Sequence, residues 1–355
     1  MPVFSLLAKP QTYTPCSTEN MLEDTEYRNY WLNHFENHFN LIARLALDNY
    51  GPSAAPRVDA CRTEFVKRLH AIRENPSALP RLDLLTLDML RQEMLIKHAL
   101  PDPFQKTKAR ENTAMLALYP HIIRDFDAHP SPDEALLLAT EGVFAGNIFD
   151  LGAGATSKMF EHESPDFFKT RDSLGGKRPW LVDHYDALAS RILHGPTHHQ
   201  AIFFVDNAGS DFLLGVLPFA RFLAQRGTRV LLAANHLPAL NDMTDAEVRS
   251  LLPRVQAIDP VFDRLVKSDQ IAPVNSGGIA PLIDLRQISN ELNAEAKRTD
   301  LVILEGMGRA LESNFEAKFT VDALKLCMIK EQITAEKHHG KIFDTVCRFD
   351  PAPRN

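Results

Sequence analysis

The feature that most constrains this chain is an apolar run that ends abruptly in Asp-Asn-Ala-Gly at residues 206–209. The residues just before it, 203–205, are typical of a strand buried on both faces of a parallel sheet. A second apolar run, residues 230–234, ends in Asn235 and leads to Asp242. Open parallel sheets bind ligands at the carboxyl ends of their strands. The two runs therefore predict one site at a sheet edge, built from two strand ends.

Strand-like and helix-like segments alternate in the second half of the chain, which predicts an α/β fold. Helices are expected over residues 211–226 and 244–252, the second with Thr244 or Asp242 as its N-cap. Such alternation implies right-handed crossovers and a mostly parallel sheet with helices on both faces. The segments expected as strands are 201–205, 229–233, 271–274, 301–304, 323–329 and 342–349.

The first half of the chain has helical periodicity instead. Trp31, Phe35, Phe39, Ile42 and Ala46 recur at the spacing of one helix face, and further helical segments follow. We therefore expect a mainly helical domain over residues 1–195, packed on a three-layer α/β/α domain over residues 196–355.

Composition narrows the range of partners. The net charge is −7 and no basic block stands out, which argues against nucleic acid. No apolar stretch reaches the length of a membrane span, and the first residues make a poor signal peptide. The four cysteines are far apart and are expected as free thiols. A cytoplasmic protein without a membrane partner is predicted; the oligomeric state is not.

Asp206, Asn207 and Asp242 are the candidate metal ligands. Three oxygen donors suit Mg²⁺ or Mn²⁺ and leave positions for water and a phosphate oxygen. Alternatively, Asp206 and Asn207 close a turn and Asp242 caps a helix, and the spacing alone does not choose. Asp206 also stands where aspartyl-phosphate phosphatases carry their nucleophile, although their usual second Asp is Ala208 here.

Two glycine-containing segments follow apolar runs and are candidates for substrate contact. They are residues 275–278 and 306–309, where the backbone can approach an anion closely. Arg309 could clamp a phosphate with two hydrogen bonds, although tight turns and a surface arginine fit the pattern equally well. Lys318, Lys325 and Lys330 are further cation candidates, with Lys330 preferred because it follows a strand.

Together these motifs resemble the damage-control phosphatase family, and within it the subfamily marked by Glu-Gly-Met-Gly-Arg, which stands here at residues 305–309. The family's Asp-Asn-Ala-Gly segment matches residues 206–209, and its Asn-x-x-Pro-x-x-Asn-Asp segment matches residues 235–242. The blocks at 145–150, 178–183, 283–286 and 324–330 also resemble the family. The resemblance runs from about residue 101 to the C-terminus.

The resemblance implies a helical domain on an α/β/α domain and hydrolysis of small phosphomonoesters. It implies a divalent cation (Mn²⁺, Mg²⁺, Co²⁺ or Ni²⁺) on Asp206, Asn207 and Asp242. The subfamily includes stand-alone plant proteins and a phosphatase domain fused to a pantothenate-kinase-like domain. The implied substrates are therefore 4′-phosphopantetheine and its oxidised or damaged forms. The residues then expected to act in catalysis are Asp206, Asp211, Arg309 and Lys330, with Asp211 orienting the attacking water.

The residues then expected to contact substrate are Asn147, Asp150, Asn275, Glu305, Gly306, Met307, Gly308 and Lys325. A sugar-phosphate phosphatase is the main alternative within the same class. An S-adenosylmethionine-dependent carboxyl methyltransferase is the alternative from another class, but residues 206–209 make a poor glycine-rich loop for its cofactor. A third alternative is a non-catalytic binding protein. The intact set of three candidate metal ligands argues against it, because binding alone would not require them.

Overall fold

A seven-stranded sheet is the centre of the computed structural model, which describes residues 1–353 except 19, 130, 149–166, 168–170 and 172–177. The strand order is β1-β7-β6-β5-β2-β3-β4. The five neighbours from β6 to β4 run parallel, and β7 is antiparallel to β6. The expected mostly parallel α/β fold is therefore confirmed. The strands are β1 (Val182–Asp183), β2 (Gln200–Phe204), β3 (Arg229–Ala234), β4 (Ile271–Asn275), β5 (Leu301–Glu305), β6 (Asp322–Met328) and β7 (Thr345–Asp350).

The register of the central strands brings their carboxyl ends to one edge. Phe204 of β2 lies opposite Ala233 of β3 and Leu304 of β5. Every residue of β2 and β5 is buried, as expected for strands covered on both faces. The polar residues that follow these strands therefore emerge side by side.

Alternate residues of the strands pack into two different hydrophobic cores. Phe203 and Ile303 belong to one core, and Ile202 and Val302 belong to the other. The first core is covered by α4 (Gln105–Ala128), α5 (Pro132–Asn147), α8 (Tyr185–His194), α9 (Leu217–Gln225), α10 (Asp245–Gln256) and α11 (Pro260–Lys267). The second core is covered by the N-terminal residues 4–7, α12 (Asn290–Glu295), the π-helix η5 (Met307–Glu312) and α13 (Gln332–Lys337).

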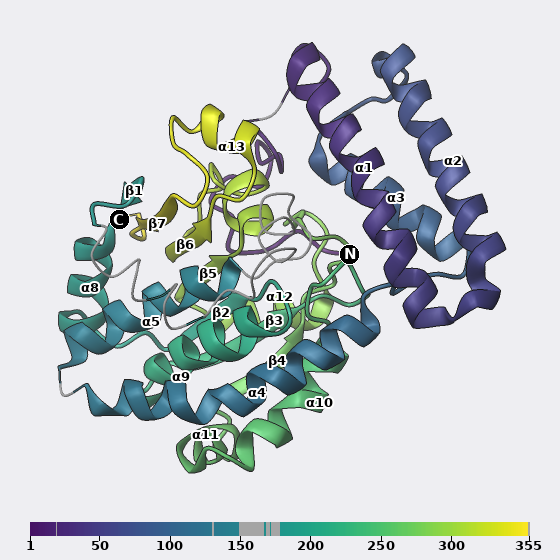
Figure 1. Ribbon diagram of the computed structural model, residues 1–355. Helices are drawn as coiled ribbons and strands as arrows, with labels where there is room; N and C mark the ends of the chain where they lie inside the picture. The colour runs from purple at the N-terminus through teal and green to yellow at the C-terminus, as the bar shows by residue number, and fades with distance from the viewer. Residues whose placement is uncertain (19, 130, 149–166, 168–170, 172–177, 354–355) are drawn as a thin grey trace.

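A third core belongs to a separate helical bundle, drawn in purple and blue beside the sheet in Figure 1. It is made by α1 (Thr25–Tyr50), α2 (Ala55–Glu74) and α3 (Leu84–Lys97), and its buried residues fall between 16 and 104, with Leu282 added from the sheet side. Helices α4, α5 and α8 share their core with the sheet instead. The expected domain boundary at residue 195 thus does not coincide with the division between the cores.

Two smaller expectations can be compared with the same structure. All four cysteines are free and buried. None of the helices among the described residues combines the length and the apolarity that a membrane crossing requires.

Phe39→Ala should lower the free energy of unfolding by about 3–5 kcal/mol, because the ring is buried in the bundle core. Phe39 lies 5.3 Å from Phe65 between ring centroids, so the substitution also removes an aromatic pair between α1 and α2. Urea unfolding followed by far-UV circular dichroism measures the change. Asn37→Ala, on an exposed position of the same helix, is the control and should change stability by less than about 0.5 kcal/mol. Equal effects of the two substitutions would contradict this account of the bundle core.

Candidate active site at the carboxyl edge of the sheet

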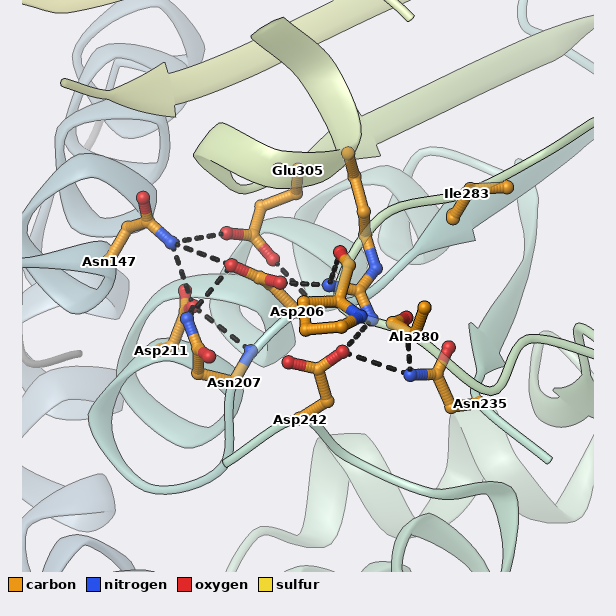
Figure 2. Close-up of polar contacts among 12 residues, drawn as sticks. Asn147, Asp206, Asn207, Asp211, Asn235, Asp242, Ala280, Ile283 and Glu305 are labelled. Atoms are coloured by element: carbon orange, nitrogen blue, oxygen red, sulfur yellow. Dashed lines mark hydrogen bonds and ion pairs between the residues drawn. The ribbon is translucent and has the colours of Figure 1, made fainter. Parts of the chain in front are cut away.

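Asp206 lies at the centre of a buried polar cluster just beyond the end of β2 (Figure 2). The amide groups of Asn147 and Asn207 donate to its Oδ2 at 3.3 and 2.8 Å. Its own backbone N–H donates to Glu305 Oε2 at 2.9 Å. The residue at the end of β2 is thus tied to the end of β5 and to the last turn of α5.

Asp206, Asp211 and Glu305 form a compact acidic group. Each offers one carboxylate oxygen, and these three oxygens lie within 4.8 Å of one another. The Asn147 amide donates to all three side chains, at 3.3, 3.0 and 3.1 Å (Figure 2). Burial is the main cause that raises the pKa of each of the three carboxyl groups above its usual range. So many buried acidic groups in one place require a compensating cation or a bound proton.

This acidic group fits a divalent metal ion. Asp211 Oδ1 is buried and accepts no hydrogen bond from any described residue. Carboxylate and amide oxygens are the ligands that Mg²⁺ and Mn²⁺ prefer. The carboxyl groups of Asp206, Asp211, Asp242 and Glu305 outnumber the two cationic side chains beside them, those of Arg309 and Lys330. A divalent ion could balance the excess negative charge.

Asp242 joins Asp206 through the backbone of two adjacent loops. Asn207 and Asp242 pair in an isolated antiparallel bridge, and the Met243 N–H donates to the Asp206 carbonyl at 2.9 Å. The following helix, α10, is capped by the Thr244 side chain and not by Asp242. Of the two N-caps that the sequence allowed, Thr244 is the observed one, and the Asp242 carboxylate accepts from Asn235 at 2.9 Å instead.

Arg309 lies between the two aspartates. One of its terminal nitrogens, Nη1, donates to Asp206 Oδ1, and the other, Nη2, donates to Asp242 Oδ2 at 2.7 Å. The Arg309 side chain is 1% exposed. The alternative of a surface arginine is therefore wrong, and the guanidinium fork predicted to clamp a phosphate is occupied by two carboxylates.

One pocket opens onto this cluster. It is lined on the sheet side by Asp206, Asn207, Asp242, Met307, Gly308 and Lys330. Lys330 is held there by its Nζ–H, which donates to the Asn147 carbonyl at 3.1 Å. The three predicted metal ligands and the preferred lysine thus share one cavity, whereas Asp211 and Glu305 lie behind them and do not line it.

Some predicted site residues lie elsewhere. Asn275 contacts His236 and the Gly277 N–H and does not line the pocket. Lys325 does not line the pocket either. Its ammonium group donates to the Phe315 and Ala317 carbonyls and forms an ion pair with Asp350 at 3.2 Å. Asp150 falls outside the described residues. Gly306 supports the site through its backbone, since it follows β5 directly with a φ of +95°.

The opposite wall of the pocket comes from the helical bundle and was not predicted. It includes Trp31, His34 and Phe35 of α1 and Asp88 and Arg91 of α3. The aromatic residues of α1 follow the spacing of a core-facing helix, so a packing role was expected for them. Asp88 and Arg91 did not stand out either, because α3 also carries Gln92, Glu93 and Lys97.

Comparison with known proteins gives the family. The model of the damage-control phosphatase ARMT1-like domain matches residues 15–346. The chain is 39% identical to pantothenate kinase 2 of Arabidopsis thaliana, over 98% of this chain and 42% of that protein. It is 34% identical to the damage-control phosphatase At2g17340 of the same plant, over 90% of this chain and 87% of that protein. It is 30% identical to the 4′-phosphopantetheine phosphatase of Mus musculus, over 97% of this chain and 48% of that protein.

The chain belongs to the damage-control phosphatase family. It spans less than half the length of the Arabidopsis pantothenate kinase 2 and of the mouse phosphatase. A solved structure of a DUF89 family protein from Pyrococcus horikoshii has the same fold, with a TM-score of 0.63 at 16% identity over 89% of this chain and 96% of that one. The family expected from the motifs is confirmed, while assignment to the Glu-Gly-Met-Gly-Arg subfamily stays a prediction.

Gly306→Ala should weaken both stability and metal binding. A Cβ at this position would overlap the Asp206 carboxylate, and the backbone conformation is one that L-residues avoid. The backbone term alone should cost about 1–3 kcal/mol. Urea unfolding and Mn²⁺ titration by calorimetry measure the two effects. Gly142→Ala in α5 is the control, because its Cβ would meet only an ordinary contact 3.5 Å from the Leu214 carbonyl; similar losses in both variants would contradict a local effect on Asp206.

Arg309→Ala should destabilise the metal-free protein by about 3–5 kcal/mol, since it leaves two buried carboxylates without their shared cation. Saturating Mn²⁺ should restore part of the loss, because a divalent ion can supply the missing positive charge. Chemical unfolding with and without the ion tests both statements. The control is Arg286→Ala, which breaks a partly exposed pair with Asp284 and should cost less than about 1 kcal/mol. A cost for Arg309→Ala as small as that of the control would show that the buried pairs do not hold the site together.

Proposed function

We propose that this chain is a metal-dependent phosphatase that hydrolyses small phosphomonoesters. One observation carries the proposal: Asp206, Asn207, Asp242 and Lys330 line a single pocket at the carboxyl edge of the sheet, in a chain of the damage-control phosphatase family. Oxygen ligands and a lysine in one cavity are the parts that phosphoryl transfer requires, because its catalysis consists mainly of positioning and charge stabilisation.

Asp206, Asn207 and Asp242 are proposed to hold the metal ion. Their position on the pocket wall supports this set, since a metal that contacts a substrate must be reachable from the pocket. When bound, such an ion polarises the phosphoryl group and lowers the pKa of a bound water. Mn²⁺, Mg²⁺, Co²⁺ and Ni²⁺ are the candidates.

Residues behind the pocket are proposed to orient these ligands. Asp211 Oδ2 accepts from both the backbone N–H and the side-chain amide of Asn207, at 3.2 and 3.0 Å. With its NH₂ group engaged in this way, the Asn207 amide presents its oxygen as the ligand atom. Asp211 is therefore proposed as a positioning residue, in place of the direct contact with the attacking water expected from the sequence.

Lys330 is proposed to neutralise the phosphate oxygens. Its side chain lines the pocket and is positioned there by the bond from Nζ to the Asn147 carbonyl, at 3.1 Å. Arg309 is proposed as a positioning residue as well, because it binds Asp206 and Asp242 and so holds these two metal ligands in place. The proposed substrates are 4′-phosphopantetheine and its oxidised or damaged forms, because the similar mouse protein is a 4′-phosphopantetheine phosphatase.

Chelator-treated protein should hydrolyse no phosphomonoester, and activity should return with Mn²⁺, Mg²⁺, Co²⁺ or Ni²⁺. The assay measures phosphate release from a panel that contains 4′-phosphopantetheine, its disulfide form and a hexose phosphate. A preference for the hexose phosphate would favour the sugar-phosphate alternative. Full activity in metal-free buffer would refute the proposed mechanism.

Two matched isosteric variants separate the pocket-facing ligands from the acidic group behind them. Asp242→Asn should lose stoichiometric Mn²⁺, whereas Asp211→Asn should retain the ion with an affinity lowered about 10- to 100-fold, as for residues that orient ligands. Metal content after dialysis and calorimetric titration give both values. The reverse order would place the ion on Asp206, Asp211 and Glu305 instead.

A further inference from the structure

The wall of the pocket that faces the metal-binding edge is built by helices α1 and α3. Trp31 and Phe35 come from α1, and Leu84, Asp88 and Arg91 from α3. These residues belong to the bundle, whereas the phosphate-binding candidates belong to the sheet. A ligand whose phosphate lies at the sheet edge must therefore extend the rest of its structure toward the bundle or out into solvent.

Two residues of this wall carry hydrogen-bond donors that have no acceptor within the described part of the chain. Trp31 Nε1 and Arg91 Nε are both buried, and neither donates to any described residue. Each residue is only 4% exposed. Buried N–H groups in folded proteins almost always have an acceptor. Because Trp31 and Arg91 line the same pocket, a ligand in that pocket can supply the acceptors that these two donors lack.

The guanidinium of Arg91 is fixed before any ligand binds. Its Nη2 donates to Asp88, and its Cζ lies 4.9 Å from the centroid of the Phe35 ring. Because Asp88 balances the charge of Arg91, this donor is better suited to a neutral oxygen than to a second phosphate. Phe35, Leu84 and Leu282 add apolar surface around the two donors.

We propose that Trp31 and Arg91 form a specificity subsite for the leaving alcohol of the phosphomonoester. The alcohol they select is an apolar chain that carries neutral carbonyl oxygens, such as amides, and its carbonyls accept from Trp31 Nε1 and Arg91 Nε. This inference rests on the proposed phosphatase function and adds the part of the substrate that is recognised away from the phosphate.

The kinetic test compares two substrates in the metal-loaded protein. The first, 4′-phosphopantetheine, has amide carbonyls, and the second, phenyl phosphate, has no oxygen beyond its phosphate. Trp31→Phe removes the N–H and keeps an aromatic ring, and Arg91→Lys keeps a cation beside Asp88 while removing Nε. In each variant the loss of kcat/KM for 4′-phosphopantetheine should exceed the loss for phenyl phosphate about 5- to 10-fold.

Trp180→Phe is the matched control. Trp180 Nε1 is also buried without an acceptor among the described residues, but Trp180 packs against Phe144 and Tyr185, away from the pocket. Its substitution should leave both rate constants unchanged. Equal losses on both substrates in the Trp31 and Arg91 variants, or no loss on either, would overturn the subsite.

A binding measurement without turnover distinguishes failure of the subsite from failure of the proposed function. The chain has two tryptophans, so Trp31 is the sole tryptophan in Trp180→Phe protein. Pantetheine, which lacks the phosphate, should change the fluorescence of Trp31, and adding Arg91→Lys should raise the half-saturating concentration about 5- to 10-fold. This result supports the subsite even if no phosphomonoester is hydrolysed. Absence of any change with pantetheine would overturn the subsite even in an active phosphatase.

Discussion

The site depends on one buried guanidinium. Arg309 contacts Asp206 and Asp242, which follow different strands and come together only where the loops after β2 and β3 meet. Two buried carboxylates would repel each other and resist desolvation, and a shared cation offsets part of both penalties. The left-handed backbone of Gly306 makes this possible, because it lets the segment that carries Arg309 turn directly against Asp206.

Asn147 has a comparable role on the other side of Asp206. Its side chain donates to three carboxyl groups, and its backbone carbonyl accepts from Lys330. The two N–H donors of this neutral amide are shared among the three acids and add no charge, so the negative charge that would attract a divalent ion is retained. Helix α5, which ends at Asn147, therefore belongs with the sheet by its contacts to the acidic group as well as by its core.

The pocket joins two parts of the chain with different physical character. The sheet side supplies charge at fixed positions, since it stands on strands buried on both faces. The bundle side supplies aromatic surface and two buried donors, and it is linked to the sheet side by Tyr30, whose hydroxyl donates to Glu331 at 2.7 Å. In the proposed enzyme the first side would act on the phosphate, which all substrates share, and the second on the group that differs among them.

The sequence was sufficient for the fold class and for much of the sheet edge. Strongly apolar runs predicted the central parallel strands, and a change from apolar to polar residues predicted that Asp206 and Asp242 would meet. The same reasoning could not tell that α4, α5 and α8 share a core with the sheet, because a helix that covers a sheet and a helix in a bundle have the same periodicity. The domain boundary at residue 195 stays a prediction. It also missed β1, whose two residues are too few to form a pattern.

What the sequence determined by itself was the chemistry available at the strand ends: oxygen ligands after β2 and β3, a lysine after β6, and glycines where the backbone turns sharply. Only the tertiary structure decided how those groups are used. Arg309 follows a strand as a phosphate-binding arginine would, but its partners are two aspartates, since burial required the acids to be neutralised. Trp31 and Arg91 are part of the pocket because the bundle packs over the sheet edge, and helical periodicity cannot show which buried face borders a cavity.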